Sequence, residues 1–314
     1  MTVISLADRV VIPRLPEGCA VALGNFDGFH YGHRHIVSTA VAKAAESGTK
    51  CAVWTFTELA KTGGVKIPFI TSREEKLDLL ASSGADYAVL EDFSAVRDMS
   101  ADDFINRILL GSLSCSFVVC GFNFRFGRGA EGDTGMLKTK LAAHGVETFV
   151  LDPVAVTLGG EKVVVSSTAI RAFIAEGDME SAAVMLGRPF FIGGMVVDGK
   201  HLGRTIGMPT VNQNFPDGHI IPKCGVYASR VSIDSVMYRA VTNIGSRPTV
   251  GGDFINAETH IFSYDGDLYG RNLRVYLCKF LRGEKKFSSV SELADAIRAD
   301  ARNADLFFSE TGII

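Results

Sequence analysis

The residue types with the clearest chemical potential gather in one short segment near the amino terminus, Gly24 to His33. This segment holds three glycines and two histidines, and it separates a short apolar run from an alanine-rich stretch that is typical of a helix. The amino end of a helix attracts anions through its free N–H groups and partial positive charge, and glycine lets a phosphate approach the backbone. His30 and His33 can face one side of the first helical turn. The segment therefore predicts a phosphate site in which two imidazoles stabilise charge on a phosphate in transfer.

Two other interpretations of this segment stay open on the residues alone. Gly-Asn and Asp-Gly pairs are common turn residues, so the segment is compatible with a purely structural turn. His30, His33 and His35 are also close enough in sequence to bind a metal. The combination of glycines and histidines at a helix start favours the nucleotide site over both.

Two further segments of the first half carry phosphate-binding chemistry. Gly121 to Gly129 follows an apolar run and contains two arginines, an amide and several glycines, a composition that also fits a solvated basic loop. Val165 to Arg171 contains two serines that can cap a helix. Its arginine then lies near the exposed N–H groups, where a guanidinium can bind phosphate at two points. A serine cap followed by an arginine is common, so this segment by itself is a weak signal.

The second half contains a candidate metal site. Thr210 and Asn212 are two residues apart in a segment whose backbone Pro209 restricts, so in an extended conformation they point to the same side. A hydroxyl and an amide oxygen suit Mg²⁺, which prefers oxygen ligands and keeps bound waters. A turn with solvated polar residues is the alternative. Glu258, which opens the run Glu-Thr-His, indicates by itself only a surface charge.

These segments together carry a resemblance to a known family. The pattern G-x-F-D-G-x-H-x-G-H at Gly24 to His33 resembles the H-x-G-H signature of adenylyl- and cytidylyltransferases. Its Phe-Asp-Gly is similar to that of the bacterial bifunctional riboflavin kinase/FMN adenylyltransferases (FAD synthetases). Gly121 to Gly127 resembles the G-x-[DN]-F-R-F-G segment of that family, Val165 to Arg171 its I-S-S-T-x-I-R motif, and Pro209 to Asn212 its kinase motif P-T-A-N. The matches occur in family order and cover essentially the whole chain.

For the adenylyl site, the resemblance implies that His30, His33 and Arg171 act on the α-phosphate of ATP. One departure concerns a neighbouring loop: family members carry T-F-x-P-H-P, whereas Thr55 to Ala60 lacks both prolines and the histidine. A differently shaped loop is therefore expected over Thr57 to Ala60. The other nucleotide contacts implied are Gly24, Asn25, Phe26, Asp27, Gly28, Asn123, Ser166, Ser167 and Thr168.

For the kinase site, the resemblance implies that Glu258 takes the proton from the riboflavin 5′-hydroxyl and that Thr210 and Asn212 bind Mg²⁺. Gly194 to His201 is close to a Walker A pattern, but it ends in histidine where the pattern needs Ser or Thr, so strand and loop are expected there. The family nevertheless places its kinase nucleotide loop in this region. The implied phosphate contacts are Lys200, Gly203 and Arg204, and the implied flavin contacts are Arg282, Glu284 and Phe287.

Length and composition set limits on the rest. The 314 residues predict two domains, and the formal net charge of −3 argues against a nucleic-acid partner. No apolar run is long enough for a membrane helix, and the start of the chain lacks the basic region and apolar block of a signal peptide. Six cysteines are scattered without a C-x-x-C pair, which favours reduced thiols in the cytoplasm over a disulfide or zinc framework. The sequence identifies no protein partner.

The elements that must position these residues change in type along the chain. Up to about Gly187, short apolar runs alternate with helical patterns, which predicts a parallel sheet with helices on both faces and ligands at the carboxyl ends of the strands. Beyond it, short strands alternate with turns, a hairpin is expected between His260–Tyr264 and a strand ending near Phe280, and a helix is expected over Val290–Phe307. The other predicted strands are Ala20–Leu23, Cys51–Phe56, Tyr87–Leu90, Phe117–Cys120 and Thr148–Leu151, and the other helices are His33–Glu46, Arg73–Ser82, Ala101–Leu110, Thr134–His144 and Asp178–Met185.

The predicted fold class is therefore α/β plus β. The resemblance assigns residues 1–186 to a doubly wound parallel-sheet nucleotidyltransferase domain and residues 187–314 to a small β-barrel riboflavin kinase domain with a terminal helix. It implies two-step FAD synthesis: ATP and Mg²⁺ convert riboflavin to FMN, and a second ATP adenylylates FMN to FAD with release of pyrophosphate. Two alternatives stay open, a riboflavin kinase whose adenylyl domain is impaired by the altered loop and a non-catalytic flavin-binding regulator. The intact histidines and Glu258 argue against the regulator.

Overall fold

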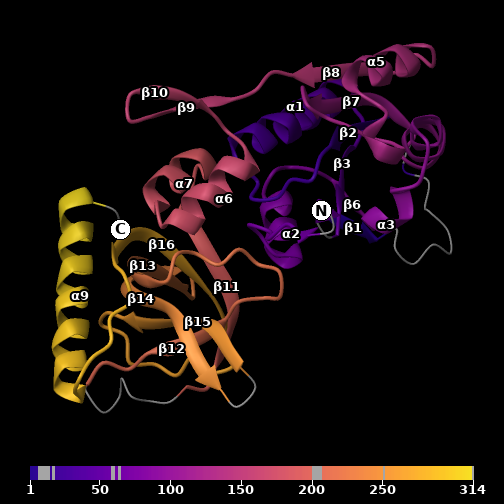
Figure 1. Cartoon of the computed structure of the whole chain (residues 1–314). Helices are drawn as coiled ribbons and strands as arrows, with labels where there is room; N and C mark the ends of the chain where they lie inside the picture. Colours follow the sequence, from indigo (N-terminus) through magenta and orange to yellow (C-terminus); the bar gives the residue numbers. More distant parts are fainter. Residues whose placement is uncertain are drawn as a thin grey trace. The chain divides into compact units, whose positions relative to one another are not determined.

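A computed structural model describes residues 1–5, 15, 18–57, 61–62, 65–199, 207–249 and 252–312. The chain folds into two compact units, Met1–Ser167 and Thr168–Ile314 (Figure 1). All six cysteines lie in the described part of the chain, as free thiols. Among these residues, no helix is both long and apolar enough to cross a membrane.

Six parallel strands form the sheet of the first unit: β1 (Thr2–Ser5), β2 (Cys19–Leu23), β3 (Cys51–Phe56), β6 (Tyr87–Glu91), β7 (Cys115–Gly121) and β8 (Glu147–Leu151). Their order is β1-β6-β3-β2-β7-β8, and every neighbouring pair is parallel. The five predicted strands are confirmed. The sequence pattern missed β1, because this short edge strand is mostly exposed and lacks an apolar run.

Helices cover both faces of this sheet, which confirms the doubly wound prediction. On one face, α1 (Tyr31–Ser47) and α2 (Arg73–Ala81) bury apolar side chains in a shared core with alternate residues of the strands. The other face carries α3 (Phe93–Val96), α4 (Ala101–Asp103) with the π-helix that continues it (Phe104–Ser112), and α5 (Thr134–Ala142). The helix predicted over Ala101–Leu110 is present, although most of it has the wider π-helical turn. The smaller elements are the pairs β4 (Lys61–Thr62) with β5 (Val65–Lys66) and β9 (Ala155–Leu158) with β10 (Glu161–Val164), and a 3₁₀-helix, Arg128–Ala130.

The strand order reverses beside β2. The chain passes from β2 through α1 to β3 on one side, whereas β7 pairs with β2 on the other side. Ligands of open parallel sheets bind at such a reversal, outside the carboxyl ends of the strands. Leu23 and Cys120 are register partners near these ends. The predicted segments Gly24–His33 and Gly121–Gly129 therefore leave the sheet from neighbouring strands at the same edge.

The second unit is a closed antiparallel barrel with helices packed on it, as the sequence predicts. The barrel order is β11-β12-β15-β14-β13-β16. Two helices, α6 (Ser167–Glu176) and α7 (Met179–Leu186), precede it, and α9 (Val290–Thr311) follows it. The strands are β11 (Phe190–Val197), β12 (Val211–Asn214), β13 (Gly225–Ile233), β14 (Val236–Thr249), β15 (Gly252–Ile261) and β16 (Asn272–Arg282).

The hairpin expected between His260–Tyr264 and the strand ending near Phe280 is wrong. β15 pairs with β12 and β14, whereas β16 pairs with β11 and β13, so the two strands are not neighbours. The connection, residues 262–271, is too long for a tight hairpin and contains two separate turns. A tight hairpin instead joins β13 to β14, where Asp234 and Ser235 have φ of 49° and 66°, as a two-residue turn of this kind requires.

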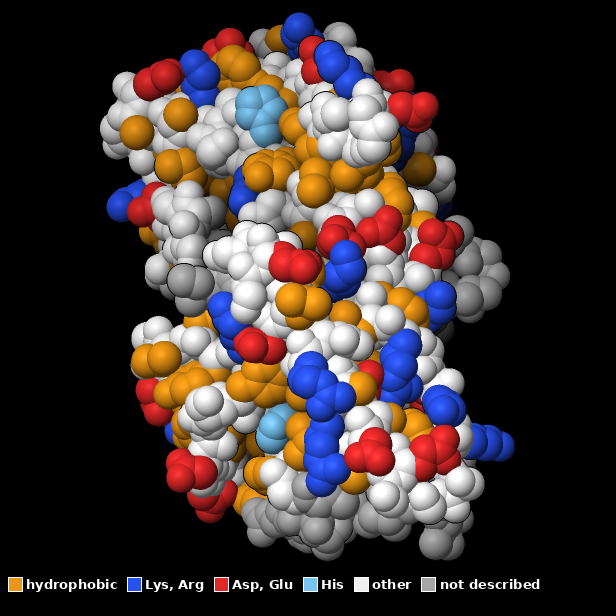
Figure 2. Space-filling view, turned by 90° about the vertical axis from the view of Figure 1, so that its left-hand side faces the viewer, with side chains coloured by type: hydrophobic (Ala, Val, Ile, Leu, Met, Phe, Trp, Pro, Cys, Tyr) orange, Lys and Arg blue, Asp and Glu red, His pale blue; other side chains and the backbone are white. Residues whose placement is uncertain are grey.

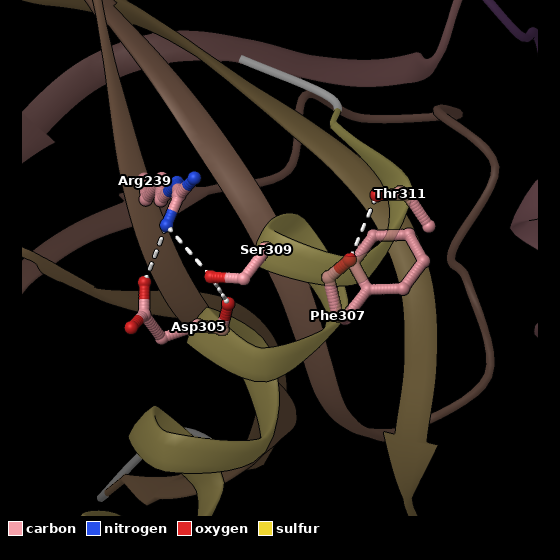
Figure 3. A network of polar contacts seen from close by, with 5 residues as sticks. All are labelled: Arg239, Asp305, Phe307, Ser309 and Thr311. Carbon is pink, nitrogen blue, oxygen red and sulfur yellow. Dashed lines mark hydrogen bonds and ion pairs between the residues drawn. The ribbon is translucent and has the colours of Figure 1, made fainter.

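A polar network holds the carboxyl end of α9 on the barrel (Figure 3). Arg239 Nη1, on β14, donates to Asp305 Oδ1 at 2.7 Å and to Ser309 Oγ at 3.4 Å. The same guanidinium lies over the ring of Phe308, which is buried against the outer face of β13 and β14. The helix continues past its predicted end at Phe307 to Thr311, and Ser309 lies in this additional turn.

Candidate functional site

The loop between β2 and α1 is held in an unusual backbone conformation. Phe26 and Phe29 have φ of 49° and 41°, and Gly28 has φ of 80°. Positive φ is uncommon for phenylalanine, and such residues gather at functional sites. Both phenyl rings are buried in the core between the sheet and α1, which offsets the strain. A Cβ at Gly24 would lie 3.0 Å from the Phe26 ring, so a larger residue there would require the ring to shift.

His30 and His33 lie together at the start of α1, as the sequence predicts. His30 is the N-cap of the helix, and its Nδ1 accepts a hydrogen bond from the His33 backbone N–H at 3.3 Å. The two imidazoles stack with centroids 3.6 Å apart and an angle of 16° between the rings. The pair therefore places two ring systems beside the first N–H groups of a helix, where an anion is favoured.

The metal alternative for these histidines finds no support. His35 lies on the exposed side of α1, whereas His30 is buried. Across the described ranges, no group of three or more His, Cys, Asp or Glu side chains is placed to hold a metal ion.

Asp27 ties the loop after β2 to the segment before α2. Its side chain is buried, and Oδ1 accepts hydrogen bonds from the backbone N–H groups of Ile70 at 2.9 Å and Thr71 at 3.1 Å. The Thr71 hydroxyl oxygen accepts from the Gly28 N–H at 3.1 Å. These bonds fix the loop that presents the histidines. A nucleotide contact of the Asp27 carboxylate stays a prediction.

Lys76 on α2 is a buried cation that the sequence analysis missed. Only 4% of it is exposed, and its Nζ donates to the carbonyl oxygen of Phe56, the last residue of β3, at 3.0 Å. Burial lowers the pKa of Lys76 to about 8, and the charge of Asp27 opposes this change. No sequence signal could have found it, because a lysine within a helical pattern normally faces water.

Three other predicted adenylyl-site residues lie on two segments, the chain beyond β7 and helix α6. Asn123 is exposed just beyond β7. Ser167 begins α6, and its Oγ donates to the Asp27 carbonyl oxygen at 3.0 Å within the first unit. Arg171 lies four residues further along α6, on the same helix face as Ser167, and belongs to the second unit. The loop after β2 and the first residue of α6 are thus brought together.

The loop that departs from the family pattern, Thr57–Ala60, follows the end of β3, where two hydrogen bonds hold the chain. Thr55 Oγ1 donates to the Asn25 carbonyl oxygen at 2.9 Å, and the Thr57 N–H donates to the Glu91 carbonyl oxygen at 2.9 Å. Residues 58–60 lie outside the described residues. The effect of this loop on the site therefore stays a prediction.

In the second unit, the barrel places Asn212 and Glu258 side by side. They are register partners on β12 and β15, and Asn243 on β14 is the partner of Glu258 on its other side. Side chains of such partners project from the same face of a sheet. Asn212 is buried, whereas Glu258 is half-buried, and the Glu258 side chain makes no hydrogen bond or ion pair with another described residue. Its carboxylate oxygens are therefore not engaged by another described side chain.

Two residues that the sequence analysis did not assign hold the Thr210–Asn212 segment. His260 Nδ1 lies 2.8 Å from the Pro209 carbonyl oxygen, and Asn256 Nδ2 donates to Asn212 Oδ1 at 3.1 Å. Both residues are two positions from Glu258 on β15. Strand alternation around Glu258 would have singled them out, but their partners on β12 only become visible in the fold.

The predicted flavin residues lie at the end of β16 and just beyond it. Arg282 is bonded through both Nε and Nη2 to the carboxylate of Asp300 on α9, and its guanidinium lies 5.8 Å from the Phe287 ring centroid. The Glu284 carboxylate lies so close to Gly245 on β14 that a Cβ there would overlap it. Glu284 is therefore near the strand that carries Asn243. Flavin contacts of these residues stay predictions.

Lys200, Gly203 and Arg204 lie outside the described residues. The chain leading to them is a strand up to Val197, which confirms strand rather than a Walker A loop for Gly194–Val197. Gly199 passes so close to the Asn212 amide that a Cβ would overlap it. The region in which the resemblance places the kinase nucleotide loop thus begins beside Asn212.

Comparisons with known proteins cover both halves of the chain. The FAD synthetase family matches residues 12–169, and the riboflavin kinase family matches residues 186–308. The bifunctional riboflavin kinase/FMN adenylyltransferase of Escherichia coli (strain K12) is 37% identical over 302 residues, 94% of each chain. This chain belongs to that family. The Bacillus subtilis (strain 168) member is 33% identical over 297 residues, 92% of each chain.

The family assignment agrees with the geometry of each unit. The FAD synthetase match includes the loop with His30 and His33, and the riboflavin kinase match includes the barrel with Asn212 and Glu258. A crystal structure called a macrolide-efflux protein, from Streptococcus pneumoniae, has a TM-score of 0.84 and 30% identity, and the likeness covers 97% of this chain and 99% of that one. Its fold is thus shared along essentially the whole chain, and its name describes that protein alone.

Proposed function

We infer that this bifunctional transferase makes FAD in two steps. The first transfers the γ-phosphoryl group of ATP to the 5′-hydroxyl of riboflavin and gives FMN. The second transfers AMP from another ATP to the phosphate of FMN and gives FAD and pyrophosphate. The observation that carries this assignment is the register pairing of Asn212 with Glu258 in a chain that also places two stacked histidines at a helix start.

For the kinase step, Glu258 is the general base. Its carboxylate is half-buried, has no partner among the described side chains, and can take the 5′-hydroxyl proton as the oxygen attacks phosphorus. The hydroxyl of Thr210 and the amide oxygen of Asn212 fit Mg²⁺, because both are neutral oxygen donors on one extended segment beside this carboxylate. Bound Mg²⁺ would supply charge neutralisation on the ATP phosphates. Gly199 lies against the Asn212 amide. The residues predicted to bind phosphate come shortly after it in the sequence: Lys200, Gly203 and Arg204.

For the adenylyl step, His30 and His33 bind and stabilise the α-phosphate as negative charge builds on it. Their position at the start of α1 adds the N–H groups of the first turn to the same anion site. Asn123 and Ser167 lie on segments that reach this edge of the sheet, which supports their role as nucleotide contacts. Arg171, four residues after Ser167 on α6, is the proposed cationic member of the set.

A riboflavin kinase with an impaired adenylyl site is the second candidate, because the Thr57–Ala60 loop departs from the family pattern. One experiment separates the readings: the protein is incubated with riboflavin, ATP and Mg²⁺, and the flavins are resolved by chromatography. FAD as the product supports the two-step assignment. FMN as the only product from riboflavin, with no FAD formed when oxidised or dithionite-reduced FMN is supplied, supports a riboflavin kinase with an impaired adenylyl site. Formation of neither FMN nor FAD overturns both hypotheses.

We propose the boundary between an adenylyl domain, residues 1–186, and a kinase domain, residues 187–314. The free thiols support a cytoplasmic location. The formal net charge of −3, with acidic side chains also present among the basic ones on the face seen in Figure 2, supports small-molecule partners (riboflavin, FMN, FAD and ATP) rather than nucleic acid.

A further inference from the structure

One face of β15 presents three polar side chains in a row: Asn256, Glu258 and His260. Residues two apart in a strand project from the same face, so the proposed base stands between an amide and an imidazole. The strand beside it, β12, is paired in register with Asn212 opposite Glu258 and Asn214 opposite Asn256. The row therefore lies alongside the segment that carries both proposed Mg²⁺ ligands.

Each neighbour of Glu258 contacts this ligand segment at a defined atom. Asn256 Nδ2 donates to Asn212 Oδ1 at 3.1 Å, and both side chains are buried, 4% and 5% exposed. His260 Nδ1 lies 2.8 Å from the Pro209 carbonyl oxygen. A carbonyl can only accept, so this ring nitrogen carries the proton and donates. Pro209 directly precedes Thr210, so the histidine fixes the backbone that leads into the first ligand.

We propose that Asn256 and His260 are positioning residues of the kinase site, which set the two Mg²⁺ ligands relative to the base. The proposal rests on the kinase function inferred above and extends it to residues that touch neither substrate nor metal. Asn256 acts on the orientation of the Asn212 amide, and His260 acts on the path of the backbone before Thr210. Because Asn256, His260 and Glu258 all lie on β15, this one strand fixes the positions of the two Mg²⁺ ligands relative to the base.

The amide orientation is the critical variable at Asn212. A carboxamide presents an oxygen on one side and an NH₂ group on the other, and only the oxygen can bind a cation. The bond from Asn256 uses one lone pair of that oxygen and leaves the other available. On the opposite side, the Asn212 amide nitrogen lies against Gly199, which has no Cβ to obstruct it. Loss of the Asn256 donor would allow the amide to rotate by half a turn and offer its NH₂ group to the cation.

Asn256→Asp tests this with almost no change of shape. A carboxylate cannot donate to the Asn212 oxygen, and it favours the rotated amide whose NH₂ group faces it. The concentration of Mg²⁺ that gives half-maximal kinase rate should rise by about 10–100-fold, the usual effect of losing a partner of a metal ligand. The matched control is Asn214→Asp on β12, an exposed position that is the register partner of Asn256, and it should leave this concentration unchanged.

His260 is tested by a pair of variants. His260→Leu removes the donor to the Pro209 carbonyl and should raise the Mg²⁺ requirement in the same direction. His260→Asn keeps an N–H donor near the position of Nδ1 and should restore a requirement close to that of the natural protein. Rescue by asparagine distinguishes loss of this hydrogen bond from loss of ring packing.

The experiment uses the full chain and two readouts. Kinase rates are measured against Mg²⁺ concentration at fixed ATP, and ADP binding is measured by calorimetry with and without Mg²⁺. The rate of FMN-to-FAD conversion in the same samples reports intact protein, because its proposed residues lie at a different site. The expected result is weaker Mg²⁺-dependent ADP binding in Asn256→Asp and His260→Leu, with Mg²⁺-free ADP binding unchanged.

The outcomes separate this inference from the function on which it rests. Normal Mg²⁺ dependence in both variants, or lower maximal rates with no change in Mg²⁺ dependence, overturns the positioning roles while the kinase assignment stands. Absence of FMN formation by the natural protein overturns the kinase assignment, and the calorimetric comparison then still decides whether Asn256 and His260 govern Mg²⁺-dependent nucleotide binding. If either variant fails to fold, the other variant and His260→Asn decide the matter.

Discussion

Arg282 and Asp300 are joined by two parallel hydrogen bonds, from Nε to Oδ1 at 2.8 Å and from Nη2 to Oδ2 at 2.6 Å. The pair connects the end of β16 to the middle of α9, and the Asp300 side chain is only 6% exposed. A planar guanidinium on a carboxylate is the strongest geometry for such a pair. The residue that the family resemblance assigned to flavin binding therefore also fastens the terminal helix to the barrel.

Arg282→Met should destabilise the second unit by about 3–5 kcal/mol, because it leaves a buried carboxylate without its partner. Scanning calorimetry should show a lower unfolding midpoint for this unit. Replacement of both residues, Arg282→Met with Asp300→Leu, should recover part of the loss. Lys285→Met breaks an exposed ion pair with Glu292 and should leave the midpoint nearly unchanged. A midpoint in Arg282→Met equal to that of the natural protein would show that the pair contributes little.

Glu258→Gln should reduce FMN formation by about 10²–10⁴-fold, because the change keeps the size of the side chain and removes the base. Conversion of supplied FMN to FAD should continue at its normal rate. Glu161→Gln, at an exposed position on β10, is the matched control for the amide substitution. Kinase activity within a few-fold of normal in Glu258→Gln would exclude the base role.

His33→Ala should reduce FMN-to-FAD conversion by about 10²–10³-fold, the usual cost of removing one donor to developing charge, and should spare the kinase. His30 needs a different substitution, because it also caps α1. His30→Asn keeps a capping side chain but removes the imidazole, so it should lose adenylylation without loss of stability. His35→Ala, on the exposed side of the same helix, should change neither the rate of adenylylation nor the stability. Equal rates in all three variants would remove the histidine pair from the mechanism.

Lys76 should make the free energy of unfolding rise with pH above about 8. In the folded state it loses its proton near pH 8, whereas in the unfolded state it holds the proton up to its ordinary pKa of 10.5. The unfolded state thus binds more protons in this window, which favours the folded state increasingly as pH rises. Burial also raises the pKa of Cys51 from its ordinary value of 9.0 to about 12. Above pH 9.0 this thiol therefore makes the free energy of unfolding fall as pH rises, opposite to the effect of Lys76.

Comparison with Lys76→Met isolates this contribution, because the cysteines are common to both proteins. Chemical denaturation at pH 7.5 and pH 9.5, two values chosen about the folded-state pKa, should show a smaller gain with pH in the variant. Lys138→Met, at an exposed lysine on α5, should behave like the natural protein. The same gain in Lys76→Met as in the natural protein would contradict a buried, partly deprotonated amine.

The kinase should work without the first unit. A fragment from Thr168 to Ile314 retains α7, whose Met185 and Leu186 are fully buried, and should phosphorylate riboflavin. A fragment from Arg188 keeps the proposed kinase residues but exposes the surface of the barrel that α7 covers. It should make FMN with a lower unfolding midpoint. A folded Thr168–Ile314 fragment without kinase activity would overturn the domain assignment.

The sequence by itself determined the types and order of the main elements and the position of the candidate motifs along the chain. The glycine-rich turn after β2 and the apolar run of that strand involve only a few consecutive residues, so they are visible in the chain. The capping of α1 by His30 appears only in the structure. The expectation of a β15–β16 hairpin failed because a single Asp-Gly pair cannot report which strands become neighbours in a closed barrel. Register between distant strands depends on the packing of the whole unit.

Only the tertiary structure decided which polar groups lose water and find each other. Lys76 meets Phe56 after a separation of 20 residues, Asn256 meets Asn212 after 44, and His260 meets Pro209 after 51. Alternation along β15 places Asn256 and His260 on the face of Glu258, but nothing local in the sequence identifies the partners of these side chains or of Lys76. Their roles arise because burial makes an unpaired polar group costly, and the partner that removes this cost is supplied by a segment that only the folded chain brings near.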